Sequence, residues 1–416
     1  MPESKPDLQT ILSQSPPPDG GIKAWTHVAL LHIVFFNTWG VSNSFGVFQQ
    51  FYVSDLLAGQ SPSSISWIGS VQTACLFALG VFSGRATDAG YFRYVFFTGV
   101  FLQVFGLMMA SLAQNYWQLF LAQGLCLGVG NGLSFIPALS TTSTYFRKNR
   151  AVAISIGAAG AALGGLIYPV LVQQLLPANK LGFGWTMRVM AFLMLATYVP
   201  CLIWYAPRLP PRKTGPLIDT TAFHEAPFLF FAASFFFNFW GVYTAFFYIS
   251  SFARDQIGIA NPSNLVIILN GAGVIGRLLP GIVADRFTGL FNLLVPLCFA
   301  GSLLTYLWSQ VHSPAGLYVF VVINGLVAHA MQSMYPTVAT TMTPDINKTG
   351  TRAGMITSAV SIAVLTGPAI SGALIQQDHG GYLYAQMFAG TSICLSAFCM
   401  LGARVSKAGW KLVVKV

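Results

Sequence analysis

The hexapeptide at Phe36–Val41 reads FNTWGV, and the one at Phe237–Val242 reads FNFWGV. Five of the six residues agree, although the two stretches lie 201 positions apart in a chain of 416 residues. Three further pairs recur at nearly the same spacing: GRATD and GIVAD from Gly84 and Gly281, PALSTT and PTVATT from Pro137 and Pro336, and RAVAIS and RAGMIT from Arg150 and Arg352. These matches share one register near 200 residues and predict two copies of one structural unit.

The composition identifies lipid as the solvent for most of the surface. Hydrophobic residues make up 55% of the chain and charged residues only 8%, against roughly 25% charged residues in ordinary soluble domains. The mean hydropathy is +0.65. Twenty-one basic and 11 acidic residues cannot cover a water-soluble protein of this size, so a membrane protein is expected.

Apolar stretches of about 20 residues are long enough to cross a bilayer as helices. Continuous apolar runs, without strict alternation, exclude a transmembrane β-barrel. We therefore predict an all-α membrane protein with twelve transmembrane helices in two parallel, pseudo-symmetric six-helix bundles. The predicted spans are 26–50, 65–86, 93–112, 117–139, 151–174, 185–206, 226–252, 263–284, 290–310, 315–338, 353–376 and 382–403.

Charge placement predicts the orientation. If both termini and the central linker are cytosolic, 18 of the 21 basic residues lie on the cytosolic side, as the positive-inside rule requires. The first 24 residues lack an apolar core, so we expect no cleavable signal peptide. The predicted units are a cytosolic N-terminal tail (1–24), a six-helix bundle (25–206), a cytosolic linker (207–225), a second bundle (226–403) and a cytosolic C-terminal tail (404–416).

Two similar halves with an even number of helices are typical of transporters that bind substrate between the halves near the bilayer midplane. The G-x-x-x-D pattern of Gly84 with Asp88, and of Gly281 with Asp285, resembles the cytoplasmic-loop signature of the major facilitator superfamily. PPPDGGIKAW at Pro16–Trp25 resembles the N-terminal signature of its fungal monocarboxylate porters. NSFGVF and GRLLPGIVADR are also similar to fungal members, and the resemblance spans residues 16–405.

The resemblance implies a gating role for the two loop signatures. Asp88, Asp285 and Arg286 are expected to hold neighbouring helix ends in the outward-facing state, with Gly84 and Gly281 completing the motif. The alternative is that the two aspartates only cap a cytosolic turn. Small residues of the fifth and eleventh helices are expected at the interface between the halves, where they allow close approach: Gly157, Gly160, Gly164, Gly165, Gly367, Pro368 and Gly372.

Arg277 is the main charged residue inside a predicted span, and lipid makes such residues costly. The resemblance implies that it faces the central cavity and binds a substrate carboxylate. The alternative is an arginine that extends to the cytosolic interface or pairs with Asp285.

The chain also departs from the resemblance. Lactate-type porters resemble one another in a helix-1 lysine and a helix-8 aspartate, and these positions are Ser42 and Gly273 here. Drug antiporters resemble one another in an arginine before Gln-Gly in helix 4, and that position is Phe120 before Gln123-Gly124. His32 and His329 are the remaining titratable groups in the spans, and either could carry a coupled proton, because imidazole changes charge near neutral pH. Each could instead be a buried, hydrogen-bonded histidine.

Uncharged polar residues inside the spans complete the candidate site. Asn37 and Asn238 occupy equivalent repeat positions, two residues before Trp39 and Trp240. We favour helix packing for this pair, although it could line the cavity from both halves. Cavity lining is favoured for Asn43, Tyr243 and Tyr335. The candidate substrate-binding residues are Arg277, Asn43, Tyr243, Tyr335, Asn37 and Asn238.

These observations favour a secondary active or facilitative transporter that moves a small organic metabolite, a carboxylate, by alternating access. Efflux of a fungal secondary metabolite is the first interpretation, and uptake of a monocarboxylate or related nutrient acid is the alternative. A sensor that does not transport is the third, and it is less favoured because the tails are short.

The expected partners are the lipid bilayer and a small-molecule substrate, with a co-transported proton as an option. We expect no nucleic acid, no cofactor, no metal and no enzymatic activity, because the sequence shows no metal-ligand cluster, nucleophile–base arrangement or phosphate-binding loop. All six cysteines lie in predicted spans and are expected to pack. A multi-pass protein of the plasma membrane is expected, with a vacuolar or other internal membrane as alternative, and a monomer unless an accessory subunit is required.

Overall fold

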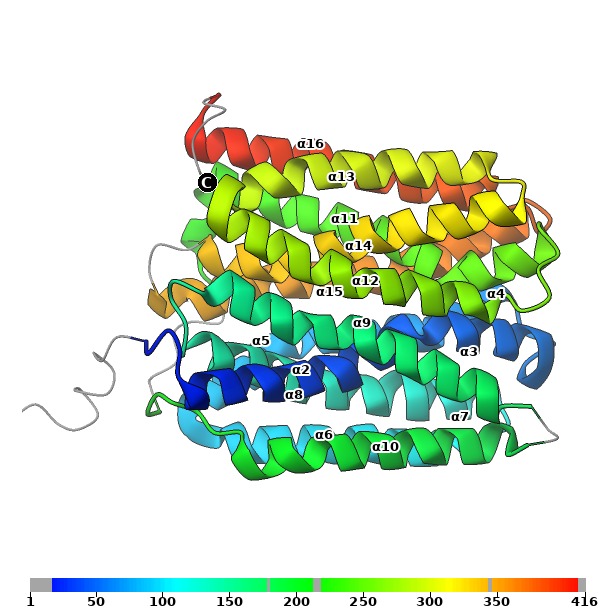
Figure 1. Ribbon diagram of the computed structural model, residues 1–416, viewed down its shortest axis with the longest axis horizontal. Coiled ribbons are helices and arrows are strands. Elements are labelled where there is room, and N and C mark those ends of the chain that lie inside the picture. Colours follow the sequence, from blue (N-terminus) through cyan, green and yellow to red (C-terminus); the bar gives the residue numbers. More distant parts are fainter. Residues whose placement is uncertain (1–16, 178–179, 212–217, 343–345, 411–416) are drawn as a thin grey trace, which may run out of the picture.

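Twelve membrane-crossing segments run side by side in the computed structural model, which describes residues 17–177, 180–211, 218–342 and 346–410 (Figure 1). The first half contains α2 with α3 (Ile22–Asn43, Phe45–Phe51), α4 with α5 (Pro62–Ala78, Gly80–Ala86), α6 (Phe92–Ala110), α7 with η3 and α8 (Tyr116–Leu119, Phe120–Cys126, Leu127–Ser143), α9 (Arg150–Leu175) and α10 (Gly182–Trp204). The second half contains α11 (Ala226–Asp255), α12 with η5 (Ser263–Val283, Ala284–Thr288), α13 with η6 (Leu290–Leu307, Trp308–Gln310), α14 (Pro314–Thr341), α15 (Ile346–Gln377) and α16 (Leu383–Ala408). Short helical segments η1 (Tyr52–Leu56), η2 (Thr87–Tyr91) and η4 (Thr220–His224) lie between them.

The predicted fold class is confirmed. Ten stretches of the described chain are long and apolar enough to cross a membrane. One of them, Pro62–Ala110, contains two passes, because the chain reverses at Gly90, whose φ is +96°. The pass formed by α2 and α3 completes the twelve. Helix α2 begins and α16 ends at the same end of the molecule, which we call the terminal face; the opposite end is the distal face (Figure 1).

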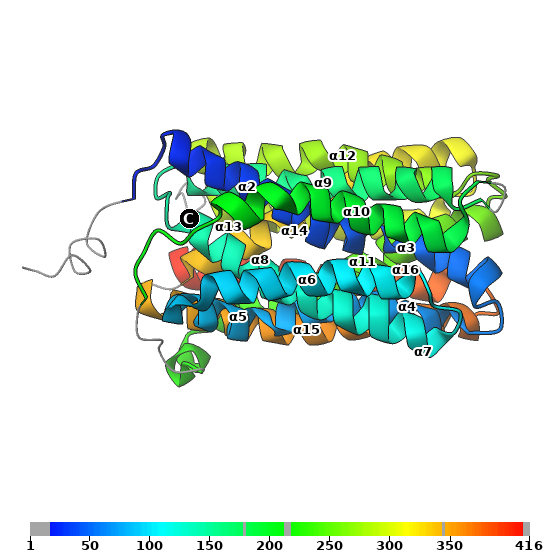
Figure 2. The ribbon, with the colours of Figure 1, turned by 90° about the horizontal axis from the view of Figure 1, so that it is seen from below.

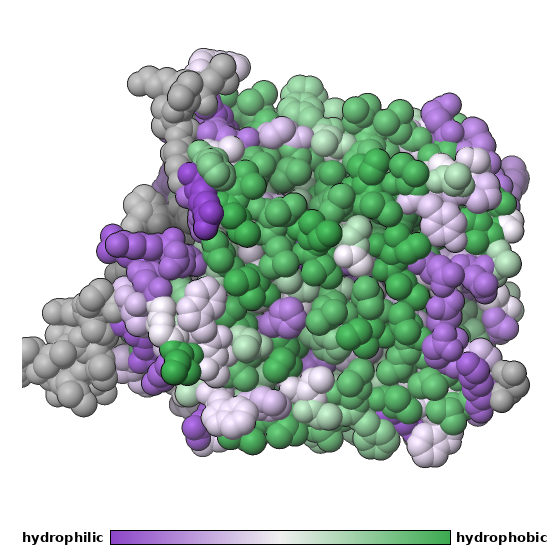
Figure 3. Space-filling model, viewed as in Figure 1, coloured by the Kyte–Doolittle hydropathy of each residue, from purple (hydrophilic) through white to green (hydrophobic). Residues whose placement is uncertain are grey.

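An apolar belt surrounds the molecule between these two faces. Figure 3 shows hydrophobic side chains over the middle of the visible face and hydrophilic ones gathered at its two ends. Large apolar side chains are exposed in this belt, among them Phe101, Leu195 and Leu303. A surface of this kind is stable in lipid and would aggregate in water.

The two halves meet along two equivalent pairs of helices. Helix α9 of the first half packs along α12 of the second, and α15 of the second packs along α4 of the first (Figure 2). Because α9 corresponds to α15 and α4 to α12 in the sequence repeat, the two contacts are related by the pseudo-two-fold axis. The repeat therefore defines both the helices and the interface between the halves.

The predicted interface glycines divide into two sets. A Cβ at Gly165 would meet Asn270 of α12 and one at Gly372 would meet Ser63 of α4, so these two lie at the interface as expected, whereas Gly157, Gly160, Gly164 and Gly367 pack against helices of their own half. The backbone at Gly160 and Gly164 lies against α2, where a Cβ on either would meet the carbonyl oxygen of His32 or Phe36. A Cβ at Gly367 would similarly meet the carbonyl of Trp240 in α11. The spacing of small residues indicates close packing but not the partner, because any neighbouring helix can use it.

Both loop signatures are helical turns. The GRATD segment continues into η2 and the GIVAD segment into η5, and each is a π-helical turn. Each turn contains or precedes a glycine with positive φ, Gly90 at +96° and Gly289 at +82°. Residues with a Cβ rarely adopt this conformation, so glycine allows the chain to leave the helix and reverse.

Candidate functional site

Arg277 lies at the centre of the second half and is almost fully buried. It belongs to α12, its side chain is 2% exposed, and its Nη2 donates a hydrogen bond to Oε1 of Gln332 on α14 at 2.6 Å. Among the described residues, no carboxylate forms an ion pair with it, and its Nε has no hydrogen-bond partner. The arginine thus neither reaches the surface nor pairs with Asp285.

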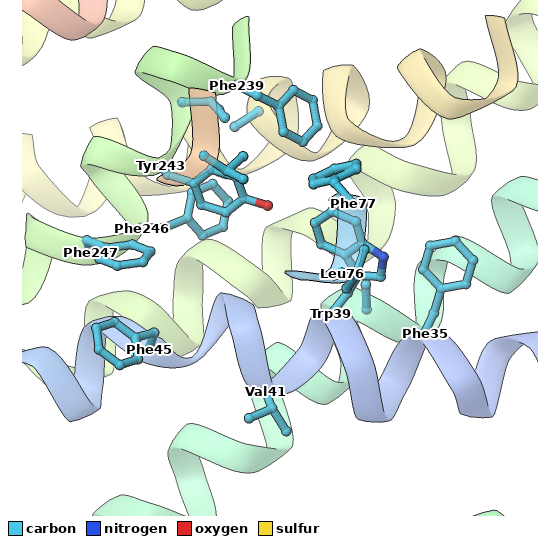
Figure 4. Packing of buried hydrophobic residues seen from close by; sticks show 14 of the residues in the cluster. Phe35, Trp39, Val41, Phe45, Leu76, Phe77, Phe239, Tyr243, Phe246 and Phe247 are labelled. Atoms are coloured by element: carbon cyan, nitrogen blue, oxygen red, sulfur yellow. The ribbon is translucent and has the colours of Figure 1, made fainter. Parts of the chain in front are cut away.

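Tyr243 of α11 adds an unpartnered donor beside this guanidinium. The side chain is buried, its hydroxyl has no hydrogen-bond partner among the described residues, and it lies close enough to Arg277 to interact electrostatically. Figure 4 shows the hydroxyl pointing from α11 toward Phe77 of the first half. Arg277, Gln332 and Tyr243 therefore form a polar group within the second half, which we call the cationic pole.

His329 stands where the resemblance would place an acid. A Cβ at Gly273 would lie 2.5 Å from the His329 ring, so the imidazole occupies the space that an aspartate at position 273 would need. The ring is fixed by the Gly325 carbonyl at Nδ1 (2.9 Å) and by Oδ1 of Asn270 at Nε2 (3.2 Å). Asn270 in turn lies against Gly165 of α9, so His329 connects the cationic pole to the interface between the halves.

A second polar group, which we call the neutral pole, lies in the first half. It consists of Trp39 and Asn43 of α2, Gln72 of α4 and Asn131 of α8, all buried and each with at least one polar atom that has no partner among the described residues. Gln72 donates to Oγ of Ser42 at 3.2 Å, so the position of the lysine in lactate-type porters is neutral and hydrogen-bonded here.

Aromatic rings connect the two poles. The Phe77 ring lies 5.2 Å from Trp39 and 5.5 Å from Phe239, measured between ring centroids. Phe239 lies 5.9 Å from Tyr243 (Figure 4). Phe246 of α11 lies 5.1 Å from His329. Since Phe77 belongs to the first half and Phe239 to the second, this aromatic contact crosses the interface.

The structure brings together Arg277, Tyr243 and His329 but places other candidates in packing contacts. Asn37 accepts from Tyr168 at 2.7 Å and donates to Thr197 at 3.0 Å, within α2, α9 and α10. The Tyr335 hydroxyl bonds with Ser234 and Ser396. Asn238 donates to the Met331 sulfur at 3.2 Å, and Nδ1 of His32 contacts the Ile156 carbonyl at 2.8 Å.

Sequence reasoning missed Gln72 and Gln332. The signal that could have found them is a glutamine in the middle of an apolar span, because an amide there must find a polar partner. Gln123, noted only for its place before Gly124, accepts a hydrogen bond from Tyr52 within the first half. A glutamine motif by itself does not distinguish these two roles.

The loop signatures lie at the terminal face and form contacts both within and between the halves. Oδ2 of Asp285 accepts from the backbone N–H of Val152 at the N-terminus of α9 (3.3 Å), and Gly281 lies against Ser155 of the same helix. A carboxylate at a helix N-terminus is favoured by the helix dipole. A Cβ at Gly84 would lie 3.4 Å from Ile136 inside the first half, Asp88 belongs to η2, and Arg286 is exposed.

Acidic residues anchor the segment before each half. Asp19 accepts from the backbone N–H groups of Arg147 and Lys148 in front of α9. Asp219, 200 positions later, accepts from Arg352 Nε at 2.9 Å at the start of α15. Burial alone would raise the pKa of Asp19, but the hydrogen bonds from the backbone of Arg147, Lys148 and Asn149 outweigh it and lower the pKa.

Metal and disulfide chemistry have no visible place in the described part of the chain. No group of three His, Cys, Asp or Glu side chains there could hold a metal ion. The six cysteines are free thiols. The buried polar atoms without a partner among the described residues include those of the two poles.

Comparison with known proteins identifies the family. Residues 30–368 match the family model described as Major Facilitator Superfamily. The chain belongs to the major facilitator superfamily. It is 41% identical over 396 residues to an "MFS-type transporter" of Gibberella zeae, covering 94% of this chain and 89% of that protein. It is 38% identical to "MFS-type transporter dbaD" (91% and 87% covered) and 34% identical to "Aspyridones efflux protein apdF" (94% and 79% covered), both of Emericella nidulans.

Family membership and the twelve helices together define a multi-pass membrane transporter of a small molecule. Trp39 of the neutral pole and Tyr243 of the cationic pole are connected across the contact between the halves by the rings of Phe77 and Phe239. Alternating exposure of this region to the two sides of the membrane is the mechanism that the two-half architecture allows.

Proposed function

We propose that this transporter exports an organic anion from a fungal cell, with the Arg277 guanidinium as the anion-binding group. The observation that carries this proposal is a buried arginine without an acidic partner among the described residues. A buried unpaired charge is unfavourable by several kcal/mol or more. A substrate carboxylate, or the enolate anion of an equally acidic enol, would supply the missing countercharge and accept two parallel hydrogen bonds.

Export is supported by the relatives. One of them carries an efflux function in its printed name, and several others are named as fungal MFS-type transporters. We place the chain in the monocarboxylate porter-like branch on the strength of PPPDGGIKAW and Arg277. Its Ser42 and Gly273 remove the charged pair of the lactate-type members, so its coupling must differ.

The contacts between the halves support a rocking mechanism. At the terminal face, Asp285 binds the start of α9. At the distal face, Oγ of Ser63 donates to the Ala369 carbonyl at 2.9 Å, and Gly46 of α3 lies against the Phe246 carbonyl. Opening either face requires one of these sets to separate while the other stays closed. We propose the gating role for Gly281 and Asp285 from these contacts, and for Gly84, Asp88 and Arg286 from the sequence motif.

His329 is the better candidate for a proton carrier, because it lies beside Arg277 and within the region that both halves share. His32 belongs to the contact between α2 and α9 inside the first half. We assign the terminal face to the cytosol from the distribution of basic residues. We further propose a plasma-membrane location and a monomeric transporter.

Transport by the full-length protein in vesicles tests the proposal. Vesicles are loaded with a panel of organic anions, and their efflux is followed with the wild-type protein, with Arg277→Gln and with Arg277→Lys. We expect loss of transport in Arg277→Gln and partial retention in Arg277→Lys, which keeps the charge but not the planar fork. Wild-type efflux kinetics in Arg277→Gln would contradict the anion site, and equal efflux from cells with and without the gene would contradict export.

A further inference from the structure

The proposed anion site leaves the neutral pole unexplained. Resting on that proposed function, we infer that the substrate binds at two poles. Its anionic group binds the cationic pole of the second half, a neutral hydroxyl or amide group binds the neutral pole of the first half, and a flat aromatic portion lies between them. The substrate class is therefore an aromatic or conjugated acid with a distal uncharged polar group.

The cationic pole offers three hydrogen-bond donors and one positive charge, and only the Tyr243 hydroxyl can also accept. Arg277 has a free Nε–H, Gln332 a free Nε2 and Tyr243 a free hydroxyl. The orientation of the Gln332 amide is fixed, because its oxygen accepts from Arg277. Three donors with one positive charge suit an oxyanion with several lone pairs and reject a cation.

The neutral pole offers both donors and acceptors and no charge. Trp39 Nε1 and the amide groups of Asn43 and Asn131 are donors without partners, and the oxygens of Asn43, Asn131 and Gln72 are acceptors without partners among the described residues. The Gln72 orientation follows from Ser42, whose hydroxyl hydrogen is donated to the Thr38 carbonyl, so the Gln72 nitrogen must donate to it. A hydroxyl or amide, which donates and accepts, is complementary to this set.

Asn37 is an amide that serves helix packing, and it differs from Asn43 and Asn131 in its hydrogen bonds. It lies in the same helix as Asn43 and is equally buried, yet both ends of its amide are hydrogen-bonded by Tyr168 and Thr197. Neither end of Asn43 or Asn131 has a partner among the described residues. A buried amide left unsatisfied is unfavourable, so two such amides in the first half point to a ligand group.

The rings between the poles define the middle of the substrate. Trp39, Phe77 and Phe239 follow one another across the interface, and Tyr243 follows Phe239 on α11 (Figure 4). Aromatic side chains favour offset or edge-on contact with another ring. An aromatic or conjugated skeleton therefore fits between the cationic pole and the neutral pole better than a sugar does.

Binding of two matched acids to the full-length protein in lipid nanodiscs tests this inference. Cinnamate has the carboxylate and the ring, and 4-hydroxycinnamate adds one distal hydroxyl. Calorimetry compares the wild-type protein with Asn131→Leu and with Asn37→Leu as the matched control. Because a site built to bind a hydroxyl discriminates against the analogue without it, we expect the wild-type protein to prefer 4-hydroxycinnamate by about tenfold.

The expected pattern separates the two proposals. Asn131→Leu should bind both acids equally while keeping its affinity for cinnamate, and Asn37→Leu should keep the preference even if its melting temperature falls. Wild-type protein that binds both acids equally or binds neither, or Asn131→Leu that keeps the preference, overturns the two-pole inference. Arg277→Gln tests the anion site on its own, and Arg277→Lys is used if Arg277→Gln does not fold. Unchanged affinity for both acids in these variants would overturn the anion site and not the neutral pole.

Discussion

The contact between Gly273 and His329 can be tested by adding a single methyl group. In Gly273→Ala, the new Cβ would lie 2.5 Å from the His329 ring, where ordinary van der Waals contact needs at least 3.4 Å. The ring must therefore move by about 1 Å, and the flexible end of the side chain cannot absorb the shift because the contacted atoms belong to the ring. Such a movement disturbs the ring's contacts with the Gly325 carbonyl and Asn270 Oδ1. Both atoms are acceptors, because Asn270 Nδ2 donates to Val266, so a neutral imidazole with one N–H makes a hydrogen bond to only one of them.

The expected destabilisation follows from these contacts. One weakened hydrogen bond contributes about 1 kcal/mol, and overpacking adds about 1–3 kcal/mol. Replacing glycine by alanine in a helix returns about 1 kcal/mol. The net loss is about 2 kcal/mol in the free energy of unfolding.

A neighbouring glycine of the same helix supplies the control. In Gly271→Ala the new Cβ meets only the terminal Cδ1 of Leu166, at 3.3 Å, and this methyl can move. The helix-propensity gain is the same, so Gly271→Ala should be neutral or slightly stabilised. Melting of the purified proteins in one detergent and at one heating rate compares the two variants, and Gly273→Ala should melt several degrees lower.

A double variant identifies the cause. His329→Ala removes the ring, so Gly273→Ala should lower the melting temperature much less in a His329→Ala background than in the wild-type background. Equal melting of Gly273→Ala and Gly271→Ala, or additive effects of the two substitutions, would refute the placement of His329 at the position of the missing acid.

Three further predictions concern the terminal face. Arg352→Gln removes two hydrogen bonds to Glu225 and one to Asp219. Because the Glu225 side chain is 43% exposed and Asp219 only 6%, we expect the free energy of unfolding to fall by about 2–3 kcal/mol. Arg254→Gln, in a partly exposed pair, should lower it by at most about 1 kcal/mol, and equal melting of the two variants would contradict this difference. Asp285→Ala removes the acceptor for Val152 N–H at the contact between the halves. In a protein without the native cysteines, a single cysteine placed at position 155 should then react faster with a membrane-impermeant thiol reagent applied from the terminal side. An unchanged reaction rate would argue against a gating contact. Because the pKa of Asp19 is lowered in the folded protein, its stabilisation of the N-terminal segment is fully present above the unfolded-state pKa, about 3.9, and is lost as the pH falls through the lower folded-state pKa. The backbone amides of Arg147 and Lys148 should therefore be protected from hydrogen exchange at pH 6 in the wild-type protein and should exchange faster at the same pH in Asp19→Asn. Equal protection in the two proteins would contradict the anchoring role of Asp19.

The one-dimensional pattern of this chain predicted most of its architecture. Length and hydropathy alone limit the spans to helices of about 20 residues, since an unpaired backbone polar group is unfavourable in lipid. The hexapeptides at Phe36 and Phe237 and the repeated G-x-x-x-D then predict two equivalent halves. The same repeat predicts that α9 and α15 play equivalent roles, as the contacts with α12 and α4 show.

The chemistry of the site required the tertiary structure, because the partners of a buried polar group are far away in the sequence. Asn37, Asn43 and Asn131 look alike as letters in apolar spans, yet only Asn37 is hydrogen-bonded at both ends of its amide. Gly273 reads as a missing acid, and only packing shows that an imidazole from α14 fills its place. The local sequence pattern predicts which helices form, because helix formation and membrane insertion are local. It does not show which side chains meet, because those contacts depend on how twelve helices pack together.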